Sequence, residues 1–195
     1  MSYCPSLGNY TCSPCNSSEK GRIRAIAIVT VGAPLPNPSS AQDWYNLVCN
    51  DLAVVIPADQ FRGGFTVESV TAPGYGATQN QTVSYDYTLT GYSRYNYLNN
   101  EFLNQLNFVT TGYELYMFTE TLILHSGVPV NFNTSTAVSE DLTTVVETMF
   151  EITFTTEKGH LDTYDAPVPS IFNSCNYEEL LASCYTCEPI SILPC

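Results

Sequence analysis

Residues 82–90 read TVSYDYTLT and residues 113–124 read YELYMFTETLIL, and these two runs decide the predicted fold. In the first run an apolar or aromatic side chain recurs at every second position from Val83 to Leu89, with polar side chains between them. A period of two predicts a strand with one face buried and one face in water.

The second run is apolar on both faces, which is typical of a strand covered on both sides. Between the runs the period changes, because Leu98, Phe102, Leu103 and Leu106 recur at helical spacing. The centre of the chain is therefore predicted to form a strand, a helix and a second strand.

The same patterns predict further elements on both sides of this central unit. Residues 125–144 are polar and contain Gly and Pro, so we expect a long excursion there with at most a short strand at 128–132. The expected elements are strands at 22–31, 52–56, 65–70 and 146–155 and a helix from 40 or 42 to 49. The prediction is a mainly β fold, a β-sandwich or partly open barrel with one central helix and short flanking helices.

Composition divides the chain into three parts. Residues 1–20 form a Cys-rich N-terminal arm, 21–160 the β-sandwich domain and 161–195 a Cys-rich C-terminal extension with one short helix at 177–184. A chain of 195 residues can bury the core of one domain.

The chain is strongly acidic, with a net charge of −13. This balance argues against binding nucleic acid through its phosphates and against an anionic membrane surface. An acidic wall would instead let a polyanion pass without sticking, and the plain alternative is a solvated acidic surface. The start MSYCPSLG has no basic and no apolar region, and no apolar run approaches the ~20 residues of a membrane helix. We expect synthesis in the cytosol, or a leader that has already been removed.

Eight cysteines suggest cross-links, and all except Cys49 lie near the chain ends. The pairs Cys12–Cys15 and Cys184–Cys187 have the C-x-x-C spacing that can hold a tetrahedral zinc ion. Disulfides and free thiols are the alternatives. We predict structural cross-links, within a subunit or between neighbours, at Cys4, Cys12, Cys15, Cys175, Cys184, Cys187 and Cys195.

Catalytic motifs are missing from the sequence. It has no G-x-S-x-G, no H-E-x-x-H and no phosphate-binding glycine loop. His125 and His160 are the two histidines, and both are expected to be structural or at the surface. The prediction is a protein that is not an enzyme and has no organic cofactor.

Four segments carry a resemblance to a known class of protein. They are GRIRAIAIV at 21–29, Trp44 in its short helix, SYDYTL at 84–89 and NEFLNQL at 100–106. In these segments and in its order of elements, the chain resembles the tail-tube and neck-ring proteins of tailed bacteriophages over about 21–157. The Cys-rich ends depart from typical tube proteins.

The resemblance implies a structural component of the virion, assembled in the host cytoplasm. Its partners would be copies of itself, joined in a ring or tube, and other virion proteins, with DNA passing through but not bound and no membrane contact. Glu147 and Glu151, on the outer face of the strand at 146–155, would then line an acidic lumen. The alternative is a secreted or surface-displayed β-sandwich module for binding or adhesion, which would bind a glycan through its tyrosines or a protein.

Overall fold

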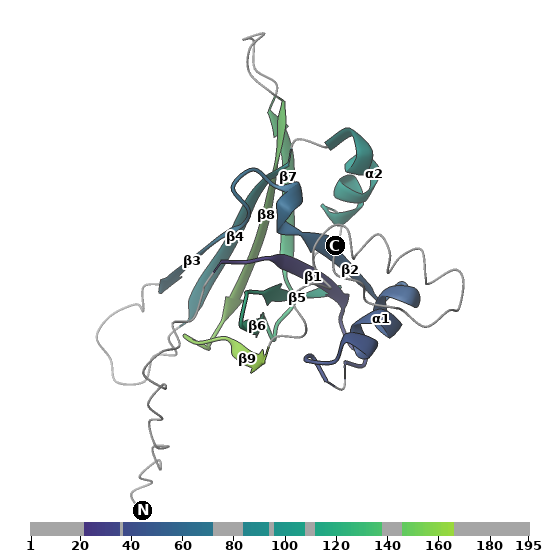
Figure 1. Ribbon diagram of the computed structural model, residues 1–195. Coiled ribbons are helices and arrows are strands. Elements are labelled where there is room, and N and C mark those ends of the chain that lie inside the picture. Colours follow the sequence, from purple (N-terminus) through teal and green to yellow (C-terminus); the bar gives the residue numbers. More distant parts are fainter. Residues whose placement is uncertain are drawn as a thin grey trace, which may run out of the picture.

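The computed structural model is a β-sandwich of two antiparallel sheets, as Figure 1 shows. The structure describes residues 22–35, 37–71, 84–93, 96–107, 112–137 and 146–165. The predicted sandwich is confirmed, and within these residues neither sheet closes into a barrel. The N-terminal arm and the helix expected at 177–184 lie outside the described residues.

The first sheet, called sheet A below, has five strands in the order β2-β1-β5-β6-β9. Sheet A consists of β2 (Ala53–Pro57), β1 (Ala25–Thr30), β5 (Tyr113–Phe118), β6 (Leu122–His125) and β9 (Asp162–Asp165). The second sheet, sheet B, has the order β3-β4-β8-β7 and consists of β3 (Thr66–Thr71), β4 (Tyr85–Ser93), β8 (Glu147–Thr156) and β7 (Asn131–Ala137). The helices are α1 (Ala41–Cys49), α2 (Asn96–Leu106) and the short 3₁₀ turn η1 (Ala58–Gln60).

Strand β1 is buried on both faces. Ile26 and Ile28 point into the core between the sheets, whereas Ala25, Ala27 and Val29 point to the opposite face of sheet A. The small alanine side chains leave room for a further layer on this second face.

Helix α1 supplies that layer. Ser40 caps this helix, because it directly precedes Ala41 and its Oγ accepts a hydrogen bond from the Asp43 backbone N–H at 3.3 Å. The indole of Trp44 is fully buried and contacts the rings of Tyr116 and Phe118 edge-on, each with a centroid distance of 5.1 Å. The fold therefore has three layers, which are α1, sheet A and sheet B.

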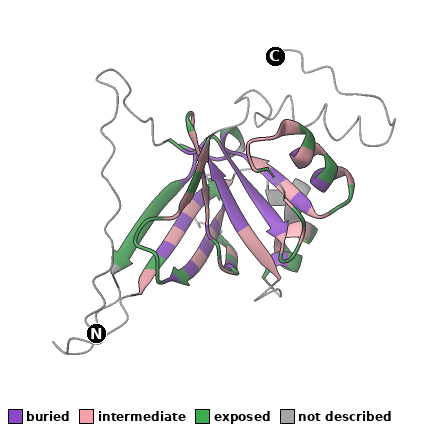
Figure 2. Ribbon diagram, turned by 90° about the horizontal axis from the view of Figure 1, so that it is seen from below, coloured by how far each residue is buried: buried purple, intermediate pink, exposed green. Residues whose placement is uncertain are grey.

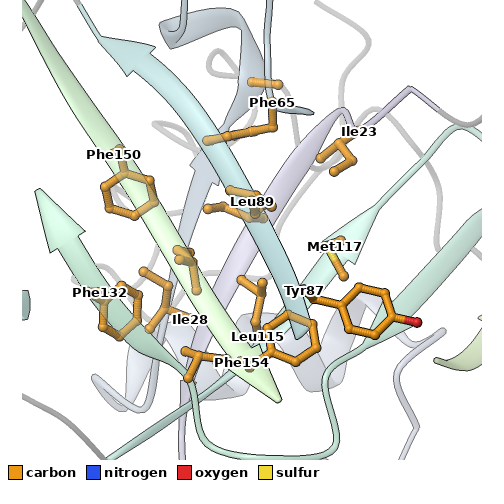
Figure 3. Close-up of a cluster of buried hydrophobic side chains, with 14 of the residues drawn as sticks. Ile23, Ile28, Phe65, Tyr87, Leu89, Leu115, Met117, Phe132, Phe150 and Phe154 are labelled. Carbon is orange, nitrogen blue, oxygen red and sulfur yellow. The ribbon is translucent and has the colours of Figure 1, made fainter. Parts of the chain in front are cut away.

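The main core lies between the two sheets, and Figure 3 shows its side chains converging from both. Sheet B contributes several aromatic rings to this core. Among them, the rings of Tyr87 and Phe154 stack with nearly parallel planes and a centroid distance of 5.0 Å. Leu89 and Ile152 pair across β4 and β8 and are fully buried. This burial confirms the strand predicted from the alternation at 82–90.

The run at 113–124 is a hairpin and not the single strand that its apolar pattern predicted. Strand β5 ends at Phe118 and β6 begins at Leu122. The hydroxyl of Thr119 accepts hydrogen bonds from the backbone N–H groups of Thr121 and Leu122, and this bonding reverses the chain. The backbone N–H of Thr119 also donates to the Leu122 carbonyl at 2.8 Å. The prediction failed because these bonds close the turn without glycine or proline.

Strand β7 is longer than the short strand expected within the excursion at 125–144. It runs from Asn131 to Ala137 and pairs with β8 along its whole length. Asn131, Asn133 and Ser135 are exposed, and Phe132 is its buried contribution to the core. The polar composition therefore gave no indication of the full length of β7, which is stabilised by its pairing with β8.

Strand β9 lies in the range 161–195 that the sequence assigned to a C-terminal extension. It pairs with β6 and forms one edge of sheet A. In the described part of the chain, no helix is both long and apolar enough to cross a membrane.

Candidate functional site

The outer face of sheet B, called the polar face below, carries carboxylate, hydroxyl and amide side chains across its four strands. Its side chains point away from the core, and none of them is buried. The polar face consists of Thr66, Glu68 and Val70 on β3, Asp86, Thr88, Thr90 and Tyr92 on β4, Glu147, Met149, Glu151, Thr153 and Thr155 on β8, and Asn131, Asn133 and Ser135 on β7. Figure 2 shows the strands of the sandwich banded between buried and exposed positions.

Two carboxylates of the polar face are held by residues opposite them on the neighbouring strand. The Thr155 hydroxyl donates to Asp86 Oδ1 at 2.7 Å, and the side-chain amide of Asn133 donates to Glu151 Oε1 at 3.2 Å. Both pairs lie in direct cross-strand register, so the sheet itself sets the position of each carboxylate at the surface.

Glu147 has a different environment from Glu151. Its Oε1 forms an ion pair with Nε of Arg62 at 2.8 Å, and the guanidinium of Arg62 lies over the ring of Tyr92 at 5.6 Å. Arg62 follows η1, and its backbone N–H donates to the Tyr92 carbonyl at 2.8 Å, which holds it beside β4. The charge of Glu147 is therefore offset locally, whereas Glu68, Asp86 and Glu151 give the polar face its negative sign.

The β7 edge of sheet B is blocked by a side chain that imitates a peptide group. Asn107 follows α2, and its Oδ1 accepts from the Thr134 backbone N–H at 2.8 Å while its Nδ2 donates to the Thr134 carbonyl at 3.1 Å. The Thr134 hydroxyl also donates to the Leu103 carbonyl in α2. These bonds occupy edge groups that an added strand would need.

The β3 edge of sheet B is exposed along its length. Every side chain from Thr66 to Val70 is exposed, including Val67 at 39% and Val70 at 62% (Figure 2). Val67 lies opposite the buried Leu89, so it is on the inner side of the sheet. Its exposure shows that β3 extends beyond the area that sheet A covers.

His125 belongs to a polar group on the outer side of sheet A. Its Nε2 lies 2.8 Å from Glu114 Oε2, and its ring stacks on Tyr116 at 4.1 Å. Burial chiefly, and then the charges of Glu114 and Tyr164, raise the pKa of Tyr116 to about 12. The ring of His125 is thus held between an acid and an aromatic face, an arrangement that fixes β5 against β6. His160 is exposed in the turn after β8.

Cys49 takes part in chemistry that the sequence did not assign to it. It is the last residue of α1 and is disulfide-bonded. All other cysteines, including the zinc candidates Cys12, Cys15, Cys184 and Cys187, lie outside the described residues. Among the described residues, no group of three or more His, Cys, Asp or Glu side chains is placed to hold a metal ion.

Sequence reasoning found the outward direction of Glu147 and Glu151 but missed two of the residues that shape their surroundings. The sequence pattern indicates no partner for Arg62 and none for Asn107. The pairing of Asn107 with Thr134 leaves no local signal, because the two residues are far apart in sequence and meet only through the fold.

Comparison with known proteins adds no family to these observations. No family model, no curated protein and no solved structure matches the chain.

Proposed function

We propose that the chain is a structural subunit, without enzymatic activity, of a tailed-bacteriophage particle. In this proposal it is made in the host cytoplasm, and copies of it assemble with one another, next to other virion proteins, into a tail tube or neck ring. The polar face of sheet B lines the lumen through which DNA passes without being bound.

The observation that carries the proposal is the polar face itself. It is a four-stranded surface in which carboxylates alternate with threonine and asparagine side chains, at positions set by cross-strand pairing. Carboxylates repel the phosphates of a duplex, and neutral hydroxyl and amide groups offer no counter-charge to hold them. A wall of this composition suits the transit of a polyanion.

The assembly is tested first by electron microscopy of the purified full-length chain across a range of concentrations. Rings or tubes of uniform diameter are expected. A chain that stays monomeric at every concentration would overturn the proposal.

The lumen is tested by reversing the charge of the polar face. The variant Glu151→Lys with Thr153→Lys makes one strand of that face more positive, and its matched control is Glu101→Lys with Gln105→Lys, the same change of charge on exposed positions of α2. Duplex DNA should be retained by assemblies of the first variant at low salt, and much less by the wild type or the control. Equal retention by the two variants would place the polar face away from the lumen.

One observation favours the alternative of a secreted or surface-displayed binding module. A disulfide at Cys49 is typical of proteins that reach an oxidising compartment. Among the tyrosines whose side chains the structure describes, however, only Tyr92 is exposed, and the guanidinium of Arg62 lies over its ring. The others are buried or half-buried, which leaves few rings for stacking on a glycan. A monomer that binds a glycan array would support the module.

A further inference from the structure

The sheet edges in the described residues are protected to different degrees. Asn107 occupies the edge groups of β7 at Thr134, β9 has only four residues and begins and ends with an aspartate, and β2 ends at Pro57 and contacts α1. Charges, proline and covering groups are the usual means by which proteins prevent strand addition. Strand β3 has six residues, no proline and one charge, at Glu68.

Charge identifies the partner that this edge can accept. A chain with a net charge of −13 repels its own copies over most of its surface. The segment TVESVT at 66–71 carries one carboxylate among β-branched and hydroxyl side chains, so two copies can approach here with little repulsion. The exposed Val67 and Val70 would lose contact with water on pairing.

We propose that β3 pairs antiparallel with β3 of a second copy, so that sheet B continues across both chains. The inference rests on the self-assembly proposed above and assigns one of its contacts. An edge-to-edge contact of identical strands has a two-fold axis perpendicular to the sheet, and paired positions then lie on the same face.

This symmetry restricts the register. With Glu68 on the axis, two carboxylates would lie opposite each other, which is unfavourable. With Ser69 on the axis, Ser69 faces Ser69 of the second copy and Glu68 faces Val70 of the second copy. An axis at Glu68 or at Ser69 pairs five residues of each β3, whereas an axis at Val67 or Val70 pairs only three. The register centred on Ser69 is therefore favoured, because it pairs five residues without two facing carboxylates. A two-fold contact cannot close a ring, so ring closure uses another surface.

The contact is tested by sedimentation of the full-length chain with Val67→Lys and Val70→Lys together. The wild type should associate in a concentration-dependent manner, and the variant should weaken the dimer by roughly tenfold or more. The control is Val146→Lys, because Val146 is exposed to the same fraction as Val67, 39%, but precedes β8. A dimer of undiminished strength in the double variant would overturn the proposal.

The register is tested by cross-linking, with peptide mass spectrometry to separate new disulfides from native ones. Ser69→Cys should form a symmetric dimer faster than Glu68→Cys, and Thr155→Cys on the interior strand β8 should form none. Faster cross-linking at position 68 would refute the register, and no cross-linking at either position would refute the contact. Because ring closure uses another surface, single rings should persist in the Val67→Lys, Val70→Lys variant, and only assemblies joined through β3 should be lost. Wild-type and variant assemblies of identical mass would sink this inference while leaving the proposed function intact.

Discussion

Replacing Gly91 by alanine should destabilise the protein through a clash with two aromatic rings. Gly91 lies on β4 opposite Phe150 and faces the core. A Cβ atom built on it would lie 2.8 Å from Phe61 Cδ1 and 2.8 Å from Phe65 Cδ1 and Cε1. Carbon atoms in ordinary contact are about 3.5–4.0 Å apart, so both rings would have to move.

Both rings are buried and pack against other aromatic rings. Phe61 and Phe65 are 4.4 Å apart between centroids, and they lie 5.9 and 6.4 Å from the ring of Phe150. Overpacking of this kind costs about 1–3 kcal/mol. Two rings must move here, so we take the middle of that range, about 2 kcal/mol. Removing a glycine from a strand returns about 0.5–1 kcal/mol, so the expected net loss of unfolding free energy is about 1–1.5 kcal/mol.

Urea denaturation followed by the fluorescence of Trp44 measures this loss, because Trp44 is the single tryptophan and is fully buried. Phe65→Leu supplies the second arm of a double-mutant cycle. A smaller side chain should relieve the clash, so Gly91→Ala should cost less in the Phe65→Leu background than in the wild type. Equal costs in both backgrounds, or a Gly91→Ala variant as stable as the wild type, would refute the reasoning.

Three further predictions concern single contacts. Asn107→Ala removes both hydrogen bonds to the Thr134 backbone, so the unfolding free energy should fall by about 1–2 kcal/mol. The Thr134 amide should also exchange its hydrogen with solvent faster. An unchanged exchange rate would contradict the protection of the β7 edge by Asn107. The raised pKa of Tyr116 favours the neutral phenol in the fold, so its contribution is complete below pH 10 and is lost as the pH rises from 10 toward 12. Tyr116→Phe should reduce this alkaline loss in urea midpoints measured from about pH 8 to 12, and an identical loss in the variant would rule the phenol out. Cys49→Ser should remove one disulfide-linked peptide from a non-reducing digest and lower unfolding free energy by about 2–4 kcal/mol, and an unchanged peptide map would show that Cys49 is not bonded in solution.

Periodicity predicted the elements whose burial pattern or cap can be identified from their own residues. Strand β8 alternates between buried and outward positions along its length, and α1 is directly preceded by Ser40, which caps it. In both cases the burial pattern or the cap lies within a few residues, so the sequence alone predicted the element. The outward direction of Glu151 follows from the same alternation.

The features that the sequence did not predict depend on partners distant along the chain or on a single side chain. The turn at Thr119 depends on one hydroxyl and a backbone bond, without glycine or proline. Strand β7 is polar because one of its faces is exposed. Asn107 and Thr134 meet across the fold, and nothing in the residues around Cys49 identifies it as a cysteine that is cross-linked. Periodicity shows which face of a helix or strand is buried, but it does not show which distant residues contact that element.

The amide of Asn107 also has a chemical lifetime. Side-chain amides hydrolyse slowly to carboxylates, and the aspartate formed here could still accept a hydrogen bond from the Thr134 N–H but could no longer donate to the Thr134 carbonyl. One bond would be lost, yet a negative charge would appear at the β7 edge, where charges discourage strand addition. Deamidation of Asn107 would therefore weaken its contact with Thr134, but the new charge would still discourage strand addition at the β7 edge. A long-lived copy of this protein would not become prone to aggregation through this residue.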